Sequence, residues 1–146
     1  RYDCHHDKTL RHRSSGTAIF NDQGEILMIK RSSTKDLGAG TWDATSAGHV
    51  QKNETYEAAA KRELFEELGI KGNLKLHSKY LFDDYNESEI QALYTVIYNG
   101  PFNINPEEIE TVEFVSKSKL PRKILNKEII FSPWAERNLQ ELGYLT

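Results

Sequence analysis

The chain has 146 residues, 38% of them hydrophobic, which is enough for one core and too few for two ordinary domains. Its 19 basic and 22 acidic residues give a formal net charge of -3, which argues against nonspecific attraction to nucleic acid polymers or to anionic membranes. We therefore expect a single domain over residues 1–146 that captures any anionic ligand in a local site.

The cysteine content and the hydropathy favour a cytoplasmic protein. The single cysteine, Cys4, cannot form an internal disulfide, and no apolar run approaches the roughly 20 residues that span a bilayer. Residues 1–13 are polar, lack an initiator methionine and fit no signal peptide, so a truncated N-terminus is expected.

The first part of the chain predicts a β-hairpin followed by a long loop. Residues 14–20 and 25–31 are strand-like runs on either side of an Asn-Asp-Gln-Gly turn. Residues 32–50 are rich in Gly, Ser, Thr and Ala and show no helical period. We expect this segment to be a functional loop with one short strand.

A helix is predicted immediately after this loop. Thr55 is the expected N-cap, and Gly69 is the residue expected to end the helix. Between them, Leu64 and Leu68 recur at the spacing of one helical face and should anchor the helix in the core.

The remaining elements indicate a mixed architecture. They are strands at 74–82, 90–98 and 111–115, a turn at 83–86, and helices at 117–125 and 133–142. In the last helix Ser132 is the expected N-cap, Pro133 the first residue and Gly143 the exit. Strands and helices do not alternate regularly, so we expect an α/β fold in which helices flank a mixed sheet.

Acidic residues concentrate on the helix after the loop. Glu63, Glu66 and Glu67 stand at i, i+3 and i+4, within about 100° of arc on one helical face. Mg²⁺ prefers hard oxygen ligands and bridges to substrate phosphates, so this cluster beside a glycine-containing loop suits a diphosphate complex. The alternative is a solvated acidic stripe with no ligand.

The spacing around these glutamates resembles the Nudix signature. The matching residues are Gly48, Glu54, Arg62, Glu63, Glu66, Glu67 and Gly69, in the order G-x5-E-x7-R-E-x2-E-E-x-G. The resemblance implies an α/β/α sandwich and hydrolysis of a diphosphate linked to another moiety. It also implies that Mg²⁺, with Mn²⁺ as an alternative, activates the attacking water.

The same resemblance implies a role for each residue of the signature. Glu66 and Glu67 would be the principal metal ligands, and Glu63 a ligand or the base that activates water. Arg62 would orient these glutamates, with Glu54 supporting the network. Gly48 would contribute to substrate binding, and Gly69 would be structural.

A wider resemblance points to the isopentenyl-diphosphate isomerase-like branch of the Nudix superfamily. The residues that carry it are His12-Arg13, Phe20-Asn21, Gly24, Arg31, Lys35, Gly40, Trp42, Gly48-His49, Glu87, Glu89 and Phe131-Ser132-Pro133-Trp134. It implies a second divalent metal site, formed by His5, His12, His49, Glu87 and Glu89.

The wider resemblance also implies substrate contacts. Arg31 and Lys35 would clamp the diphosphate, since a guanidinium and an ammonium can neutralise adjacent phosphates. Trp134 would face a cationic intermediate, although the same residue could simply anchor the last helix in the core. Trp42 and Tyr80 could likewise stack on a base or fill the core.

Ala47 separates this chain from the isomerases, which place a proton-transferring cysteine at that position. A methyl group cannot transfer protons, so hydrolysis is preferred over isomerisation. A third hypothesis is that the chain is a nucleotide-binding module without catalytic activity. The identity of the substrate and the oligomeric state stay open, because neither a base-reading motif nor a heptad or apolar stripe is present.

Overall fold

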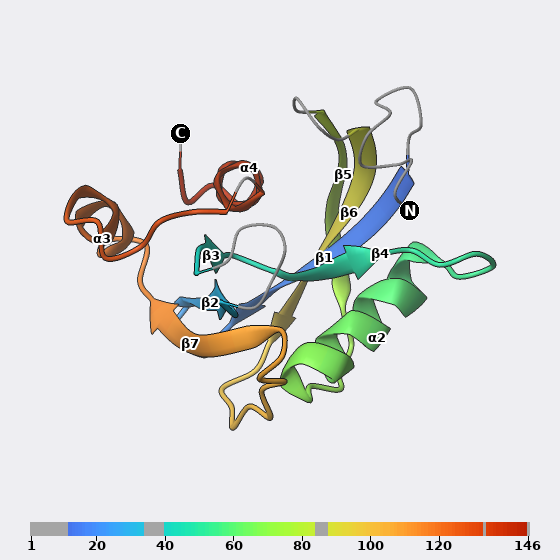
Figure 1. Cartoon of the computed structure of the whole chain (residues 1–146), viewed down its shortest axis with the longest axis horizontal. Helices are drawn as coiled ribbons and strands as arrows, with labels where there is room; N and C mark the ends of the chain where they lie inside the picture. The colour runs from blue at the N-terminus through green and yellow to red at the C-terminus, as the bar shows by residue number, and fades with distance from the viewer. Residues whose placement is uncertain (1–11, 34–39, 84–87, 133, 146) are drawn as a thin grey trace.

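The computed structural model (Figure 1) describes residues 12–33, 40–83, 88–132 and 134–145. Its elements are β1 (His12–Phe20), β2 (Ile26–Arg31), β3 (Trp42–Asp43), β4 (Ser46–His49), α2 (Tyr56–Leu68), β5 (Lys75–Asp83), β6 (Ser88–Ile97), β7 (Ile109–Val115), α3 (Leu120–Leu125) and α4 (Ala135–Glu141). No helix in this part of the chain is long and apolar enough to cross a membrane.

The described strands form one mixed sheet of seven strands around β1. The main path runs β3-β2-β1-β6-β5, while β4 pairs with β1 and β7 pairs with β2. The β1–β6 pair is parallel, whereas β4 lies antiparallel to β1, from Ser14↔His49 to Thr17↔Ser46. Because the predicted hairpin partner β2 meets β1 at Phe20↔Ile26, the first half of β1 is left to pair with β4.

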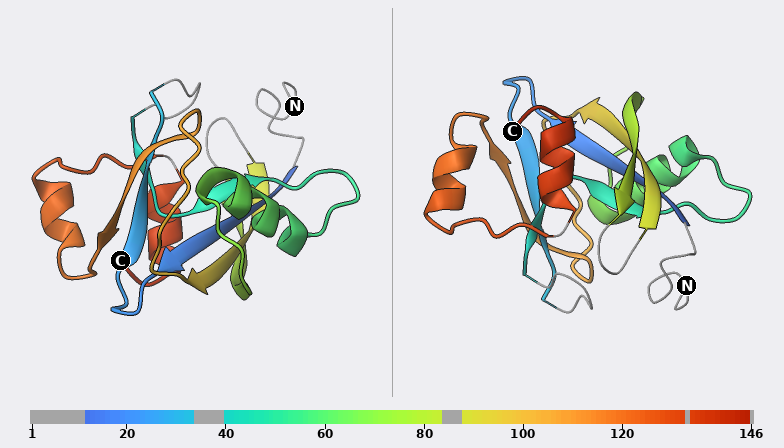
Figure 2. Two further views of the ribbon diagram at one scale, coloured as in Figure 1. Left: turned by 90° about the horizontal axis from the view of Figure 1, so that it is seen from below. Right: turned by 90° about the horizontal axis from the view of Figure 1, so that it is seen from above.

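Helices α2 and α4 cover opposite faces of this sheet, as the views from below and above show (Figure 2). Alternate residues of β1 point to the two sides: Ile19 packs with Leu64 and Leu68 of α2, and Ala18 packs with Leu139 of α4. This period-two alternation is what a strand buried on both faces requires. The predicted α/β fold with a mixed sheet between helices is confirmed.

Local signals at both ends of α2 act as the sequence predicts. The Thr55 side chain accepts a hydrogen bond of 3.0 Å from the amide of Ala58, which satisfies one free donor of the first turn. Gly69 adopts a left-handed conformation with φ of 70°, and its amide donates to the Phe65 carbonyl. A Cβ at Gly69 would also lie 2.7 Å from the Cβ of Asn103.

Several element boundaries differ from the prediction for tertiary reasons. Residues 32–50 contain two short strands, β3 and β4, because their backbones pair with the distant strands β2 and β1. Helix α3 begins at Leu120 and is shorter than predicted, with Pro121 in its first turn, where a missing amide proton costs nothing.

The start of α4 corrects a second expectation. Ser132 is not its N-cap, because the Ser132 hydroxyl donates instead to the carboxylate of Asp43. Trp134 occupies the cap position and makes no side-chain hydrogen bond to the helix. Gly143 leaves the helix with φ of 80°, as predicted. Pro133 lies outside the described residues, as does most of the predicted turn at 83–86.

Candidate active site

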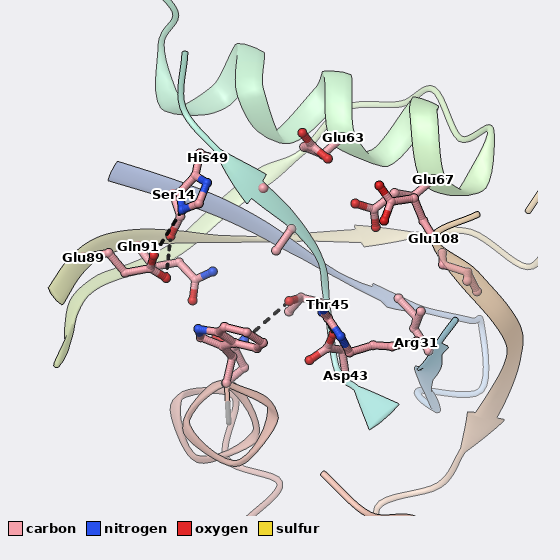
Figure 3. A pocket seen from close by; sticks show the side chains of 16 residues that line it. Ser14, Arg31, Asp43, Thr45, His49, Glu63, Glu67, Glu89, Gln91 and Glu108 are labelled. Carbon is pink, nitrogen blue, oxygen red and sulfur yellow. Dashed lines mark hydrogen bonds and ion pairs between the residues drawn. The ribbon is translucent and has the colours of Figure 1, made fainter. Parts of the chain in front are cut away.

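Two glutamates of α2 face a cavity of about 320 Å³ between the helix, β4, β7 and α4. Figure 3 shows Glu63 and Glu67 pointing from α2 into this space, with Glu108 beneath Glu67. Glu66 does not line the cavity, and its side chain is 56% exposed. The acidic face of α2 therefore turns two of its three glutamates toward a common site.

Gly48 brings the backbone of β4 against the Glu63 carboxylate. A Cβ at this position would overlap the carboxylate and lie 2.7 Å from Glu63 Cγ. Any side chain here would push Glu63 away from β4. The glycine of the signature is thus explained by close packing against Glu63.

Arg62 holds the acidic residues of the site in place. Its Nε and Nη2 atoms bond the two carboxylate oxygens of Glu54 at 2.8 and 3.1 Å, and Nη1 lies 2.6 Å from Glu63. Nη2 also donates to the His49 carbonyl at 3.0 Å, which ties the guanidinium to β4. The hydrogen bond from Arg62 lowers the pKa of Glu54. This geometry is compatible with the orienting role expected of Arg62 and Glu54, which stays a prediction.

The Glu67 carboxylate has the most perturbed environment of this group. Burial raises its pKa well above the usual value of a glutamate, and the neighbouring Glu63 and Glu108 raise it further. The Ser46 hydroxyl opposes this effect by donating to Glu67 Oε1 at 3.0 Å. Glu67 therefore resists ionisation while no positive charge is close to it.

Glu108 is a site residue that the sequence analysis missed. It stands in the turn before β7, where its amide donates to the Asn105 carbonyl. Its carbonyl accepts from the Ser32 amide at 3.0 Å, just beyond the end of β2. The pairing of β7 with β2 brings Glu108 to the cavity, and no local spacing could have indicated that contact.

The histidines and glutamates of the expected second metal site are described only in part. His49 Nε2 lies 3.8 Å from Glu89 Oε2, and Ser14 donates to Glu89 Oε1 at 3.1 Å. The backbone of His12 pairs in register with Glu89. His5, Glu87 and the side chain of His12 lie outside the described residues. Within the described segments no three His, Cys, Asp or Glu side chains are grouped to hold an ion, so this site stays a prediction.

Of the residues expected to contact substrate, some line the cavity and others do not. Arg31 pairs with Asp43 at 2.9 Å, and its guanidinium lies 5.2 Å from the centre of the Trp134 ring. Arg31 and Trp134 both line the cavity, whereas Lys35 is outside the described residues. Trp42 is 9% exposed and packs in the core, so it fills space there.

The comparisons with known proteins agree with this geometry. The model of the NUDIX domain matches residues 10–135. The chain belongs to the Nudix family. An uncharacterised Nudix hydrolase of Yersinia pestis is 34% identical over 94% of this chain and 79% of its own length. The prediction of a Nudix hydrolase is confirmed.

One further relative bears on the branch, and one solved structure bears on the architecture. Isopentenyl-diphosphate Delta-isomerase 2 of Photorhabdus laumondii is 31% identical over 95% of this chain and 81% of its own, in line with the isomerase-like resemblance. A MutT Nudix hydrolase from Burkholderia pseudomallei superposes with a TM-score of 0.74 at 25% identity, covering 91% of this chain and 98% of that one.

Proposed function

We propose that this Nudix protein is a Mg²⁺-dependent pyrophosphohydrolase. Its substrate would be a nucleoside diphosphate linked to another moiety, or a similar diphosphate, and water would be the nucleophile. The observation that carries this proposal is the placement of Glu63 and Glu67 in one cavity beside Gly48. A solvated acidic stripe would instead leave these carboxylates in open water.

The carboxylates of the cavity fit a divalent cation. Mg²⁺ in enzymes is commonly bound by one or two carboxylates, with water and substrate phosphate oxygens completing its coordination. Glu63 and Glu67 supply such ligands, and the like charges that raise the pKa of Glu67 are those that a cation would offset. When bound, Mg²⁺ or Mn²⁺ neutralises nonbridging phosphate oxygens and lowers the pKa of water.

The protein side chains then orient the reactants and accept a proton. Arg62 fixes the Glu63 carboxylate through its 2.6 Å contact, while Ser46 holds one oxygen of Glu67. Glu63 or Glu67 would accept the proton of the attacking water at a carboxylate oxygen, since both border the cavity. Glu66, whose side chain is exposed and does not line the cavity, would act as a ligand only from another side-chain conformation.

Binding of the diphosphate would use the far wall of the cavity. Arg31 offers a guanidinium beside the Trp134 ring, and Lys35 is the second cation of the expected clamp. Because Arg31 is paired with Asp43, a phosphate would have to share or displace that contact.

The decisive variant is Glu67→Gln, which removes a charge while keeping the shape of the side chain. We expect Mg²⁺-dependent release of product from a panel of diphosphates to fall on the order of 100-fold or more, because a ligand or proton acceptor is lost. The panel holds ADP-ribose, ADP-glucose, a dinucleoside polyphosphate, a nucleoside triphosphate and isopentenyl diphosphate. Glu57→Gln on the same helix, exposed and paired with Lys61, is the matched control and should keep full activity. Full activity of Glu67→Gln would contradict the proposal.

The similarity to an isomerase keeps isomerisation as a second candidate function. Against it stands Ala47, an exposed methyl in the wall of the cavity where the isomerases carry a cysteine. We expect no dimethylallyl diphosphate from isopentenyl diphosphate. Clear conversion, followed by proton NMR, would favour isomerisation over hydrolysis.

A catalytically silent nucleotide-binding module is the third candidate. It would gain nothing from a water-activating base, yet Glu63, Glu67 and Arg62 are all present. Calorimetric binding of ADP-ribose without product in either Mg²⁺ or Mn²⁺ would favour this candidate.

A further inference from the structure

Buried amide side chains line the cavity at a distance from the glutamates of α2. Gln91 of β6 is 3% exposed, Asn138 of α4 is 1% exposed, and both border the cavity together with Thr45. Figure 3 shows Gln91 across the cavity from Glu67, on the far side of β4. The hydrolytic mechanism proposed above does not use these amides.

Tyr80 of β5 joins the two amides into one network. Its hydroxyl is hydrogen-bonded to Oε1 of Gln91 and to Oδ1 of Asn138, and Asn138 Nδ2 donates to Thr45 Oγ1 at 3.4 Å. The Arg137 guanidinium lies 4.3 Å from the centre of the Tyr80 ring and covers it from outside. Tyr80 of β5 therefore holds the amide of β6 and the amide of α4 at once.

Gln91 keeps one end of its amide for a ligand. The Tyr80 phenol has one proton, so it can donate to the side-chain oxygen of only one of the two amides. The other amide can be flipped, so that its N–H group donates to the phenol oxygen. In either arrangement Tyr80 uses only one end of the Gln91 amide. The other end has no hydrogen-bond partner in the described part of the chain, and Gln91 borders the cavity. Gly16 leaves room there, since a Cβ on it would lie 3.2 Å from Gln91 Nε2.

This arrangement discriminates between kinds of ligand. A hydroxyl or amide group entering the cavity can satisfy the unpaired end of Gln91. A hydrocarbon would cut that end off from water and leave it unpaired, which weakens binding on the order of 10- to 100-fold. Sites built to hydrogen-bond a substrate reject analogues that lack the group for this reason.

We propose that Gln91 is a specificity-determining residue, with Tyr80 and Asn138 as positioning residues. The Gln91 amide selects a hydroxyl-bearing moiety, such as a sugar, on the substrate beyond the diphosphate, and it disfavours a hydrocarbon chain. This inference rests on the proposed function, because the glutamates of α2 and Gln91 border the same cavity and would contact one substrate at two points.

The test compares hydrolysis of ADP-ribose with hydrolysis of isopentenyl diphosphate, each in Mg²⁺. Gln91→Met keeps the length of the side chain and removes its polar end. We expect kcat/KM for ADP-ribose to fall on the order of 10- to 100-fold while kcat/KM for isopentenyl diphosphate does not fall. Gln140→Met, the same change at an exposed position of α4, is the matched control and should leave both values within about a factor of two.

The ratio of the two kcat/KM values separates specificity from structural damage. A loss of packing alone would lower both values together, so an equal fall would overturn the inference, as would an unchanged ratio or a wild-type preference for isopentenyl diphosphate. Tyr80→Phe is the second variant: it keeps the ring under Arg137 and should shift the ratio in the same direction by a smaller factor. If wild-type protein hydrolysed neither compound nor any other diphosphate of the panel, the proposed function would fail as well.

Discussion

Gly48 and Glu63 show how a single residue can shape this site. The carboxylate of Glu63 occupies the space that a side chain at position 48 would need, so helix and strand approach each other only because that residue is glycine. The Nudix signature indicated that both residues belong to the site. Their direct contact became evident only in the folded chain.

The raised pKa of Glu67 predicts that the stability of the metal-free protein falls as pH rises. In the metal-free folded protein, burial is the main cause that raises the pKa of Glu67 above its value in the unfolded chain. At pH values between these two pKa values, the folded state therefore binds more protons than the unfolded state. The stabilisation from this group is therefore complete below the unfolded pKa and is lost as pH rises through the folded pKa. Glu67→Gln has no such proton to lose.

We expect Glu67→Gln to lose less stability than wild type as pH rises above the usual pKa of a glutamate, when both proteins are metal-free. Chemical denaturation at a series of pH values, with EDTA present, would measure the free energy of unfolding. Glu57→Gln serves again as the exposed control and should follow the wild-type curve. A constant difference between Glu67→Gln and wild type at all pH values would contradict the raised pKa.

At the scale of an element, α2 is the part of the molecule that local sequence defined best. Its cap, its exit glycine and its buried leucines all agree with one helix in one orientation. That orientation turns Glu63 and Glu67 toward the cavity and leaves the Glu66 side chain exposed to solvent. The same packing that buries the leucines of α2 therefore points Glu63 and Glu67 into the cavity.

The N-cap of α2 offers a test of what local capping contributes to stability. Thr55→Ala removes the 3.0 Å hydrogen bond to the Ala58 amide and should lower the free energy of unfolding by about 1 kcal/mol. Thr55→Ser retains the hydroxyl and should stay close to wild type. Urea titration followed by circular dichroism measures both variants. Equal stability of Thr55→Ala and wild type would show that the cap contributes nothing.

At the scale of the whole molecule, the cavity exists because separate strands and helices meet around β4. Glu108 arrives with β7, Gln91 with β6 and Asn138 with α4, on both sides of the sheet. A ligand that contacts these groups binds only the folded chain. Such binding stabilises the fold by mass action.

We expect Mg²⁺ to raise the melting temperature of the wild-type protein. At ten times its dissociation constant the added free energy is about 1.4 kcal/mol, or a rise of roughly 4 °C for a domain of this size. Differential scanning calorimetry with NaCl at matched ionic strength controls for screening. Glu67→Gln should show little of this rise, and an equal rise in both proteins would mean that Mg²⁺ binds elsewhere.

The sequence by itself determined what depends on local pattern: the caps and the acidic face of α2, the hairpin, and the signature that identified the family. Local periodicity, capping and turn chemistry suffice for the helix and the hairpin because the interacting residues lie only a few positions apart. The signature is a pattern of residue types within one continuous segment, residues 48–69. The tertiary structure alone decided the partners of Ser132, the burial of Trp42, and the arrival of Glu108 and Gln91 at the cavity. Those contacts join residues far apart in the chain, and they follow from strand pairing and from the packing of helices on two faces, which no local spacing encodes.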